Sequence, residues 1–256
     1  MTLKPSRPRK KAAPKADADL QKPLLLIVGQ SHTDAVKKVL LTEPADDIVV
    51  INFNLVSDPI YEKGRFDPRM VADFAPTHLI SMAGGNYHNV FGLIENPVRF
   101  NFMEADDRSE DVDAERLNIP YALMYDFFNT GMREGFLQTL LEIRNCFNVP
   151  TCHVCSPPPY PDSQHIIDNP GNYFSNKIHL GVSPPALRRK LYDVHTRVYR
   201  EFCAENGITF IPPPRKAVDK DGFLRSPYWR NDPTHANHKY GKLVLGQIRE
   251  LVGRTS

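Results

Sequence analysis

Five short runs of mainly apolar and β-branched residues, separated by segments with helical periodicity, constrain the fold of this chain more than any other feature. Runs of this length are typical of strands that a parallel sheet buries on both faces. They are Leu24–Val28, Asp47–Phe53, His78–Met82, Thr151–Cys155 and Ile208–Ile211. The segments around them predict helices at Thr33–Leu41, Pro68–Phe74, Met132–Phe147, Pro185–Asn206 and Asn237–Val252.

This alternation predicts an α/β fold, because parallel strands need crossover helices, which cover both faces of the sheet. We expect a three-layer α/β/α sandwich with a five-stranded parallel sheet of the flavodoxin-like type. The 256 residues suffice for one large domain, which we place at residues 23–256. Residues 87–130 make a long connection that is polar in its middle and aromatic on both sides. A connection of that length is usually functional, so we predict an insertion there that acts as a lid or binds substrate.

The first 22 residues carry seven Lys or Arg and two Asp, interleaved with Pro and Ala. This composition predicts a disordered basic leader. A solvated tail is the plainer interpretation, and contact with nucleic acid or anionic lipid is the alternative. The whole chain has a net charge of +2, so the body without its leader is slightly acidic. We therefore expect no nucleic-acid partner.

The composition also bears on the compartment. No run approaches the roughly 18 apolar residues of a membrane span, and Leu24–Val28 is too short for the apolar core of a secretion signal. The four cysteines are too few for a disulfide framework. These features predict a cytoplasmic protein without a membrane contact, and they do not predict its oligomeric state.

Gly29-Gln30-Ser31 directly follows the first predicted strand, at the end of the sheet where open α/β folds place their ligand sites. The glycine allows a sharp turn, which presents the Ser31 hydroxyl at a helix N-terminus. The amides there favour developing negative charge. Taken alone, a serine that only caps the helix is the plainer interpretation.

Two further polar segments occupy comparable positions. Gly84-Gly85-Asn86 follows the third strand, where its glycines permit close approach of a ligand and Asn86 offers an amide donor for an oxyanion. Asp232 precedes His235 by three residues before the last helix, so it can orient the imidazole through one ring nitrogen and leave the other free for a proton. An ordinary turn and a helix-capping cluster are the respective alternatives.

In their order and placement, the three segments resemble the SGNH (GDSL-like) hydrolase superfamily, which includes esterases, lipases, carbohydrate acetylesterases and some acyltransferases. Gly29-Gln30-Ser31 matches the family's Gly-Asp-Ser turn with Gln in place of Asp, and Gly84-Gly85-Asn86 matches its Gly-x-Asn block. Asp232 and His235 match its Asp-x-x-His block, and the resemblance spans residues 23–251. The family's second block supplies another glycine amide to the oxyanion, whereas residues 54–57 contain no glycine.

The resemblance implies that Ser31 attacks an acyl carbonyl while His235, oriented by Asp232, removes its proton. It also implies that the Ser31 amide, Gly85 and Asn86 hold the oxyanion or the substrate. We accordingly expect a serine esterase, without a cofactor, that cleaves a small-molecule or carbohydrate ester such as a sugar O-acetate. An O-acyltransferase with the same residues remains an alternative. So does a non-catalytic binding module on a degenerate SGNH scaffold.

Two groups of residues suggest a metal site, but each has a plainer interpretation. Cys152 and Cys155 stand three apart in a predicted strand, so they point to opposite faces, and no second cysteine pair completes a tetrahedral site. His238 lies three residues after His235 at a helix start and is more simply a solvated residue of the first turn. We predict no metal site.

Overall fold

One sheet of five parallel strands forms the centre of the molecule, in the order β2-β1-β5-β8-β9. The computed structural model describes residues 24–53, 61–62, 65–66, 75–103 and 115–255. The strands are β1 (Leu25–Gly29), β2 (Ile48–Asn52), β5 (His78–Met82), β8 (Thr151–Val154) and β9 (Thr209–Ile211). All five predicted strands are confirmed, and their order is that of flavodoxin-like folds.

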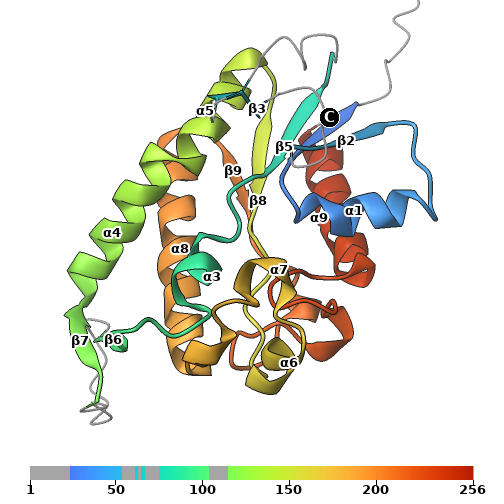
Figure 1. Cartoon of the computed structure of the whole chain (residues 1–256). Coiled ribbons are helices and arrows are strands. Elements are labelled where there is room, and N and C mark those ends of the chain that lie inside the picture. The colour runs from blue at the N-terminus through green and yellow to red at the C-terminus, as the bar shows by residue number, and fades with distance from the viewer. Residues whose placement is uncertain (1–23, 54–60, 63–64, 67–74, 104–114, 256) are drawn as a thin grey trace, which may run out of the picture.

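Helices cover both faces of this sheet (Figure 1). The alternation of side chains along β1 shows why, since Leu25 and Ile27 join the core under one helical layer while Leu26 and Val28 join the core on the opposite face. The first layer holds α1 (Thr33–Leu40) and α9 (His238–Thr255), and the second holds α4 (Tyr121–Glu134), α5 (Phe136–Cys146) and α8 (Pro185–Glu205). The predicted three-layer α/β/α sandwich is confirmed.

The predicted helix at residues 132–147 is wrong in its extent. The chain forms two helices, α4 and α5, which break at Gly135, where φ is −115° and ψ is −103°. Most of α4 falls in the segment that was expected to be an insertion. The predicted helix at residues 68–74 and the basic leader at residues 1–22 lie outside the described residues.

Shorter elements complete the fold. Around the sheet's carboxyl end lie α3 (Tyr87–Gly92), α6 (Ser163–Asp168) and α7 (Gly171–Phe174). Three single 3₁₀ turns follow, at Ile178–Leu180, Arg215–Ala217 and Ser226–Tyr228. Two small sheets lie outside the main one, an antiparallel pair of β3 (Tyr61–Glu62) with β4 (Arg65–Phe66) and a parallel pair of β6 (Phe100–Met103) with β7 (Leu117–Pro120). No helix in the described part of the chain is long and apolar enough to cross a membrane.

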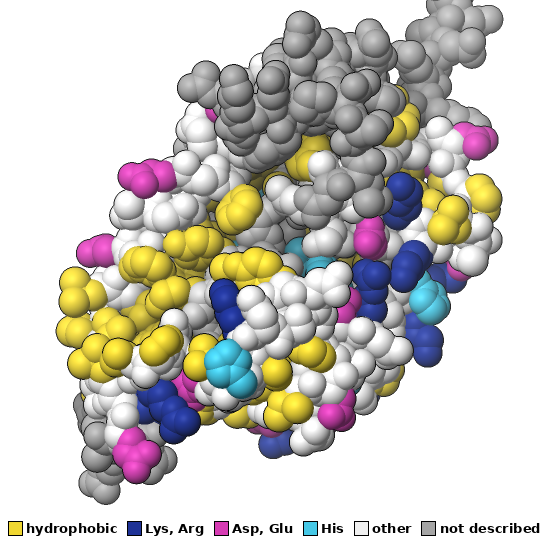
Figure 2. Space-filling view, viewed as in Figure 1, with side chains coloured by type: hydrophobic (Ala, Val, Ile, Leu, Met, Phe, Trp, Pro, Cys, Tyr) yellow, Lys and Arg dark blue, Asp and Glu magenta, His cyan; other side chains and the backbone are white. Residues whose placement is uncertain are grey.

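The described residues of the predicted insertion at 87–130 belong largely to a second apolar core. Phe102, Met124 and Phe128 are buried there against the apolar stripe of α8. The surface of this part of the chain keeps exposed apolar side chains (Figure 2), on α3, on α4 and in or beside the β6–β7 pair: Val90, Val98, Met103, Leu117, Leu123 and Phe127. That the segment at residues 87–130 acts as a lid or binds substrate stays a prediction.

A group of buried histidines lies where α3 and α8 meet β8. The rings of His88 and His195 are 4.8 Å apart, and the His153 ring stacks on Tyr199 at 4.1 Å. Burial lowers the pKa of His153 to about 3. Burial, followed by the nearby His153, lowers the pKa of His195 to about 3 as well. The folded protein therefore holds these rings neutral, whereas the unfolded chain takes up a proton on each below about pH 6.5.

This difference in proton binding predicts that the free energy of unfolding decreases as the pH falls from about 6.5 towards 3. Each buried histidine contributes a slope of roughly 1.4 kcal/mol per pH unit. We expect His195→Leu to reduce this slope in urea titrations between pH 4 and 8. His179→Leu, which replaces an exposed histidine, should leave it unchanged. Equal slopes in the two variants would contradict this account of acid sensitivity.

Candidate active site

The turn between β1 and α1 presents Ser31 at the carboxyl end of the sheet. The Thr33 amide donates to the Gln30 carbonyl at 3.0 Å, and the Asp34 amide donates to the Ser31 carbonyl at 3.1 Å. These bonds close a tight turn directly after Gly29, the last residue of β1. The Ser31 side chain thereby lies at the start of α1 and lines an open pocket.

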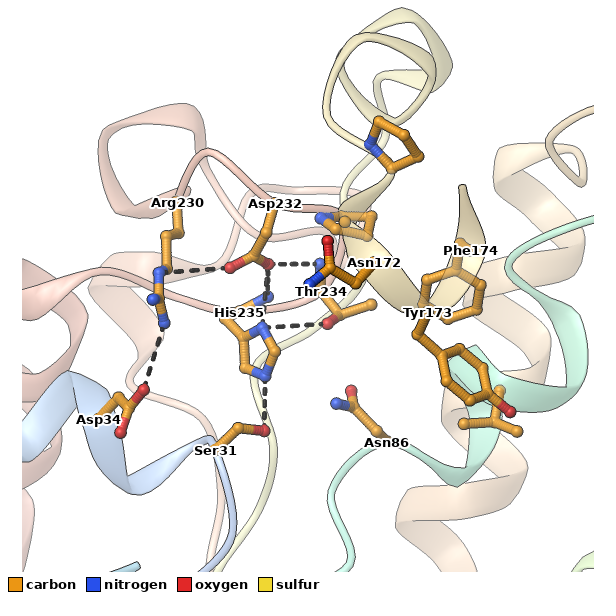
Figure 3. A pocket seen from close by; sticks show the side chains of 14 residues that line it. Ser31, Asp34, Asn86, Asn172, Tyr173, Phe174, Arg230, Asp232, Thr234 and His235 are labelled. Carbon is orange, nitrogen blue, oxygen red and sulfur yellow. Dashed lines mark hydrogen bonds and ion pairs between the residues drawn. The ribbon is translucent and has the colours of Figure 1, made fainter. Parts of the chain in front are cut away.

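His235 reaches Ser31 from the far end of the chain. Its Nε2 atom lies 2.7 Å from the Ser31 Oγ atom, although the two residues are 204 positions apart in the sequence. His235 Nδ1 lies 3.0 Å from Asp232 Oδ1, so the three predicted residues stand in one line of contacts (Figure 3). Asp232 Oδ1 also accepts the amides of Thr234 at 3.0 Å and His235 at 2.8 Å, which fixes the loop around the carboxylate.

The charges around this line keep Asp232 ionised. Burial raises the pKa of Asp232, but the hydrogen bond and charge of His235 and the two loop amides outweigh it, so the pKa lies below its usual value. A second histidine, His32, lies with its ring 5.0 Å from that of His235. Burial first, and then the charge of His235, lower the pKa of His32 to about 3. His32 is therefore neutral beside the line of contacts.

The Gly84-Gly85-Asn86 turn is bound directly to the Ser31 turn. The Gly84 amide donates to the side-chain oxygen of Gln30 at 2.9 Å. Gly84 has a φ of 74°, and a side chain there would overlap the Tyr199 hydroxyl, so both the backbone conformation and the space require glycine. Gln30, which stands where the SGNH family has Asp, thus has a structural role in this chain.

The two predicted oxyanion residues differ in their placement. Asn86 lines the same pocket as Ser31, and its amide faces the Ser31 hydroxyl in Figure 3. Its Oδ1 atom accepts the side-chain amide of Asn89 at 2.9 Å, which fixes the orientation of the group. Gly85 is buried against the His32 ring and is not among the described residues that line the pocket. A donor role for Gly85 stays a prediction, and residues 54–57 lie outside the described part of the chain.

The pocket has a volume of about 500 Å³, and the sequence motifs account for only part of its lining. Its further walls come from α7, with Asn172, Tyr173 and Phe174, and from Arg230 and Asp34 beside the Asp232 carboxylate. The short helix α7 carries no periodic pattern, so no sequence signal marks these residues. Arg230 offered one weak signal, its position two residues before Asp232.

The metal-site alternatives receive no support from the geometry. Cys152 and Cys155 are both buried, and the Cys155 sulfur lies 3.3 Å from the Tyr192 hydroxyl. His238 is exposed at the start of α9. Among the described residues, no group of three or more His, Cys, Asp or Glu is arranged to hold a metal ion.

No model of a protein family matches the chain, and no curated protein matches it in sequence. Its fold is similar to several solved structures with TM-scores of 0.45 to 0.46, and the two described next each have a TM-score of 0.46. A GDSL-like lipase from Bacteroides thetaiotaomicron shares 12% identity over 92% of this chain and 89% of its own. Est24, a carbohydrate acetylesterase from Sinorhizobium meliloti, shares 12% identity over 92% of this chain and 100% of its own.

A third similar structure is the periplasmic domain of a lipopolysaccharide acetyltransferase from Salmonella ser. Paratyphi A, with a TM-score of 0.46 and 10% identity over 90% of this chain and 84% of its own. At such identities and TM-scores, these likenesses assign no role to any residue. The side-chain geometry of this chain has to carry any assignment of function.

The contact between Gln30 and Gly84 predicts a stability effect. Gln30→Leu leaves the Gly84 amide without its acceptor, so we expect the free energy of unfolding to fall by about 1–2 kcal/mol. Gln30→Glu keeps an oxygen in the same place and should retain most of the stability. Urea denaturation at pH 7 measures both. Equal losses in the two variants would show that the contact itself contributes nothing.

Proposed function

We propose that this chain is a serine hydrolase of the SGNH type that cleaves an acyl ester. The observation that supports this most is the line of contacts from Ser31 through His235 to Asp232, with distances of 2.7 and 3.0 Å. A serine within hydrogen-bond reach of a histidine, which a carboxylate orients in turn, is the arrangement that activates a hydroxyl nucleophile. A non-catalytic binding module on a degenerate scaffold does not require this alignment of three side chains.

Each proposed residue has one task in the reaction. Ser31 Oγ attacks the acyl carbonyl carbon while His235 Nε2 takes the hydroxyl proton, and Asp232 stabilises the imidazolium that forms. The tetrahedral intermediate then collapses, the ester C–O bond breaks, and His235 gives the proton to the leaving alcohol oxygen. Water attacks the acyl-enzyme through the same base, which releases the acid and restores the Ser31 hydroxyl.

The oxyanion is proposed to bind at the start of α1. The Ser31 amide lies two residues before the first residue of α1, at the helix N-terminus, where amides and the helix dipole favour negative charge. The Asn86 side chain, which lines the same pocket as Ser31, supplies a second donor. Its orientation is fixed by Asn89, so the donor is in place before the charge develops on the oxygen.

The lining of the pocket supports a short acyl group on a polar alcohol, such as a carbohydrate O-acetate. Asn172 offers a donor for hydroxyl groups, while the exposed Tyr173 ring offers a flat apolar surface to the face of a sugar. An acceptor hydroxyl in place of water would make the same residues an O-acyltransferase. The products formed with and without added sugar distinguish the two reactions.

The decisive experiment compares the wild-type chain with Ser31→Ala on short-chain acyl esters and acetylated sugars. We expect Ser31→Ala to lose ester cleavage and labelling by a fluorophosphonate probe while keeping its thermal midpoint, because the hydroxyl is the nucleophile and not part of the core. The wild-type rate should fall towards acid pH, where a protonated His235 cannot accept the proton. Cleavage by Ser31→Ala, or no Ser31 labelling of the wild type, would contradict the proposed function.

Asn86 should act on turnover more than on binding. Loss of one oxyanion donor typically lowers turnover about 10²–10³-fold, and the contact strengthens only as charge develops. We therefore expect Asn86→Ala to reduce kcat with little change in KM. A rise in KM alone would make Asn86 a substrate contact, and unchanged kinetics would remove it from the oxyanion site. Asn89→Ala is the matched variant, since it frees the Asn86 amide without deleting it.

A further inference from the structure

Arg230 joins two carboxylates that belong to different parts of the site. Its Nε atom lies 3.3 Å from Asp232 Oδ2, and its Nη1 atom lies 3.5 Å from Asp34 Oδ2. Asp34 lies in the first turn of α1, where its amide donates to the Ser31 carbonyl at 3.1 Å. The contacts run from Ser31 through His235, Asp232 and Arg230 to Asp34. Because Asp34 is hydrogen-bonded to Ser31 through the backbone, they form a closed ring (Figure 3).

The two oxygens of Asp232 have separate partners. Oδ1 lies against the His235 ring and accepts two loop amides, while Oδ2 faces Arg230. A carboxylate held on both oxygens cannot rotate away from the imidazole without losing one set of contacts. A guanidinium suits this task, because its planar fork presents donors in fixed directions to more than one acceptor.

The other end of this connection is anchored in the sheet. Asn52, the last residue of β2, is buried and donates its side-chain amide to Asp34 Oδ1 at 2.9 Å. Asp34 is therefore held by β2 on one oxygen and faces Arg230 with the other. The Arg230 side chain is 35% exposed and lines the pocket, but any anionic substrate group there would also meet the two carboxylates. A substrate-anchoring role is thereby disfavoured.

From this ring of contacts, we infer that Arg230 is a positioning residue that ties the Asp232–His235 loop to α1 and so keeps His235 in reach of Ser31. The inference rests on the proposed function, because it concerns the geometry of the same reaction. A shift of about 1 Å in a catalytic group can cost on the order of 10²-fold in rate. We therefore expect loss of the tie to lower turnover while the pocket still binds substrate.

The test is a double-mutant cycle of Arg230→Gln and Asp34→Asn, read by kcat and KM on the best ester. Each single variant should lose about ten- to hundred-fold in kcat with KM nearly unchanged, and the double variant should lose no more than the worse single one. Arg230→Lys, which keeps the charge but not the fork, should recover part of the loss. Lys242→Gln, which breaks the exposed Lys242–Glu43 ion pair, is the matched control and should behave as wild type.

A readout independent of turnover keeps the inference separate from the proposed function. Amide hydrogen exchange at Thr234 and His235 should quicken in Arg230→Gln, because the loop loses its tie. If the wild type cleaves no ester but this exchange is still faster in Arg230→Gln, the proposed function is contradicted, whereas the positioning of the loop by Arg230 is supported. Unchanged exchange, additive losses in the cycle, or a KM effect confined to anionic esters would each overturn the inference.

Discussion

The packing of α1 against α9 is the constraint on which the rest of the site depends. The two helices meet at their backbones, since a side chain at Gly241 would overlap the Ala35 carbonyl. Val36 and Val39 of α1 and Val244 of α9 are buried in the same apolar core. This contact places the loop before α9, which carries His235, next to the turn before α1, which carries Ser31. The 2.7 Å distance between Ser31 and His235 therefore depends on this apolar burial as well as on the polar contacts that position the loop.

The parts of the fold that follow from local pattern could be predicted from the sequence. The five strands are short apolar runs that both helical layers bury, and such runs differ clearly from the helices around them. The break at Gly135 could not be predicted, because Phe128, Met132 and Leu140 keep an apolar spacing across it. The helix α7 could not be predicted either, because four residues are too few to show any period.

The candidate site divides in the same way. Ser31, Asn86, Asp232 and His235 were predictable because their motifs follow strands or precede a helix, and parallel topology brings those points together at one edge of the sheet. The partners of these residues were not. The contact between Gln30 and Gly84 and the two contacts of Arg230 depend on how loops cross in space, and neither leaves a periodic trace in the sequence.

The distance in sequence between Ser31 and His235 also bears on how the protein is made. The β1–α1 turn leaves the ribosome early, and it can fold against β2 and β5 while most of the chain is still unsynthesised. His235 is synthesised 204 residues later, and its position is not fixed until α9 has emerged and packed on α1. The nucleophile and its base therefore cannot meet during most of translation. A chain cut short before α9 could keep much of its sheet and still lack a completed site.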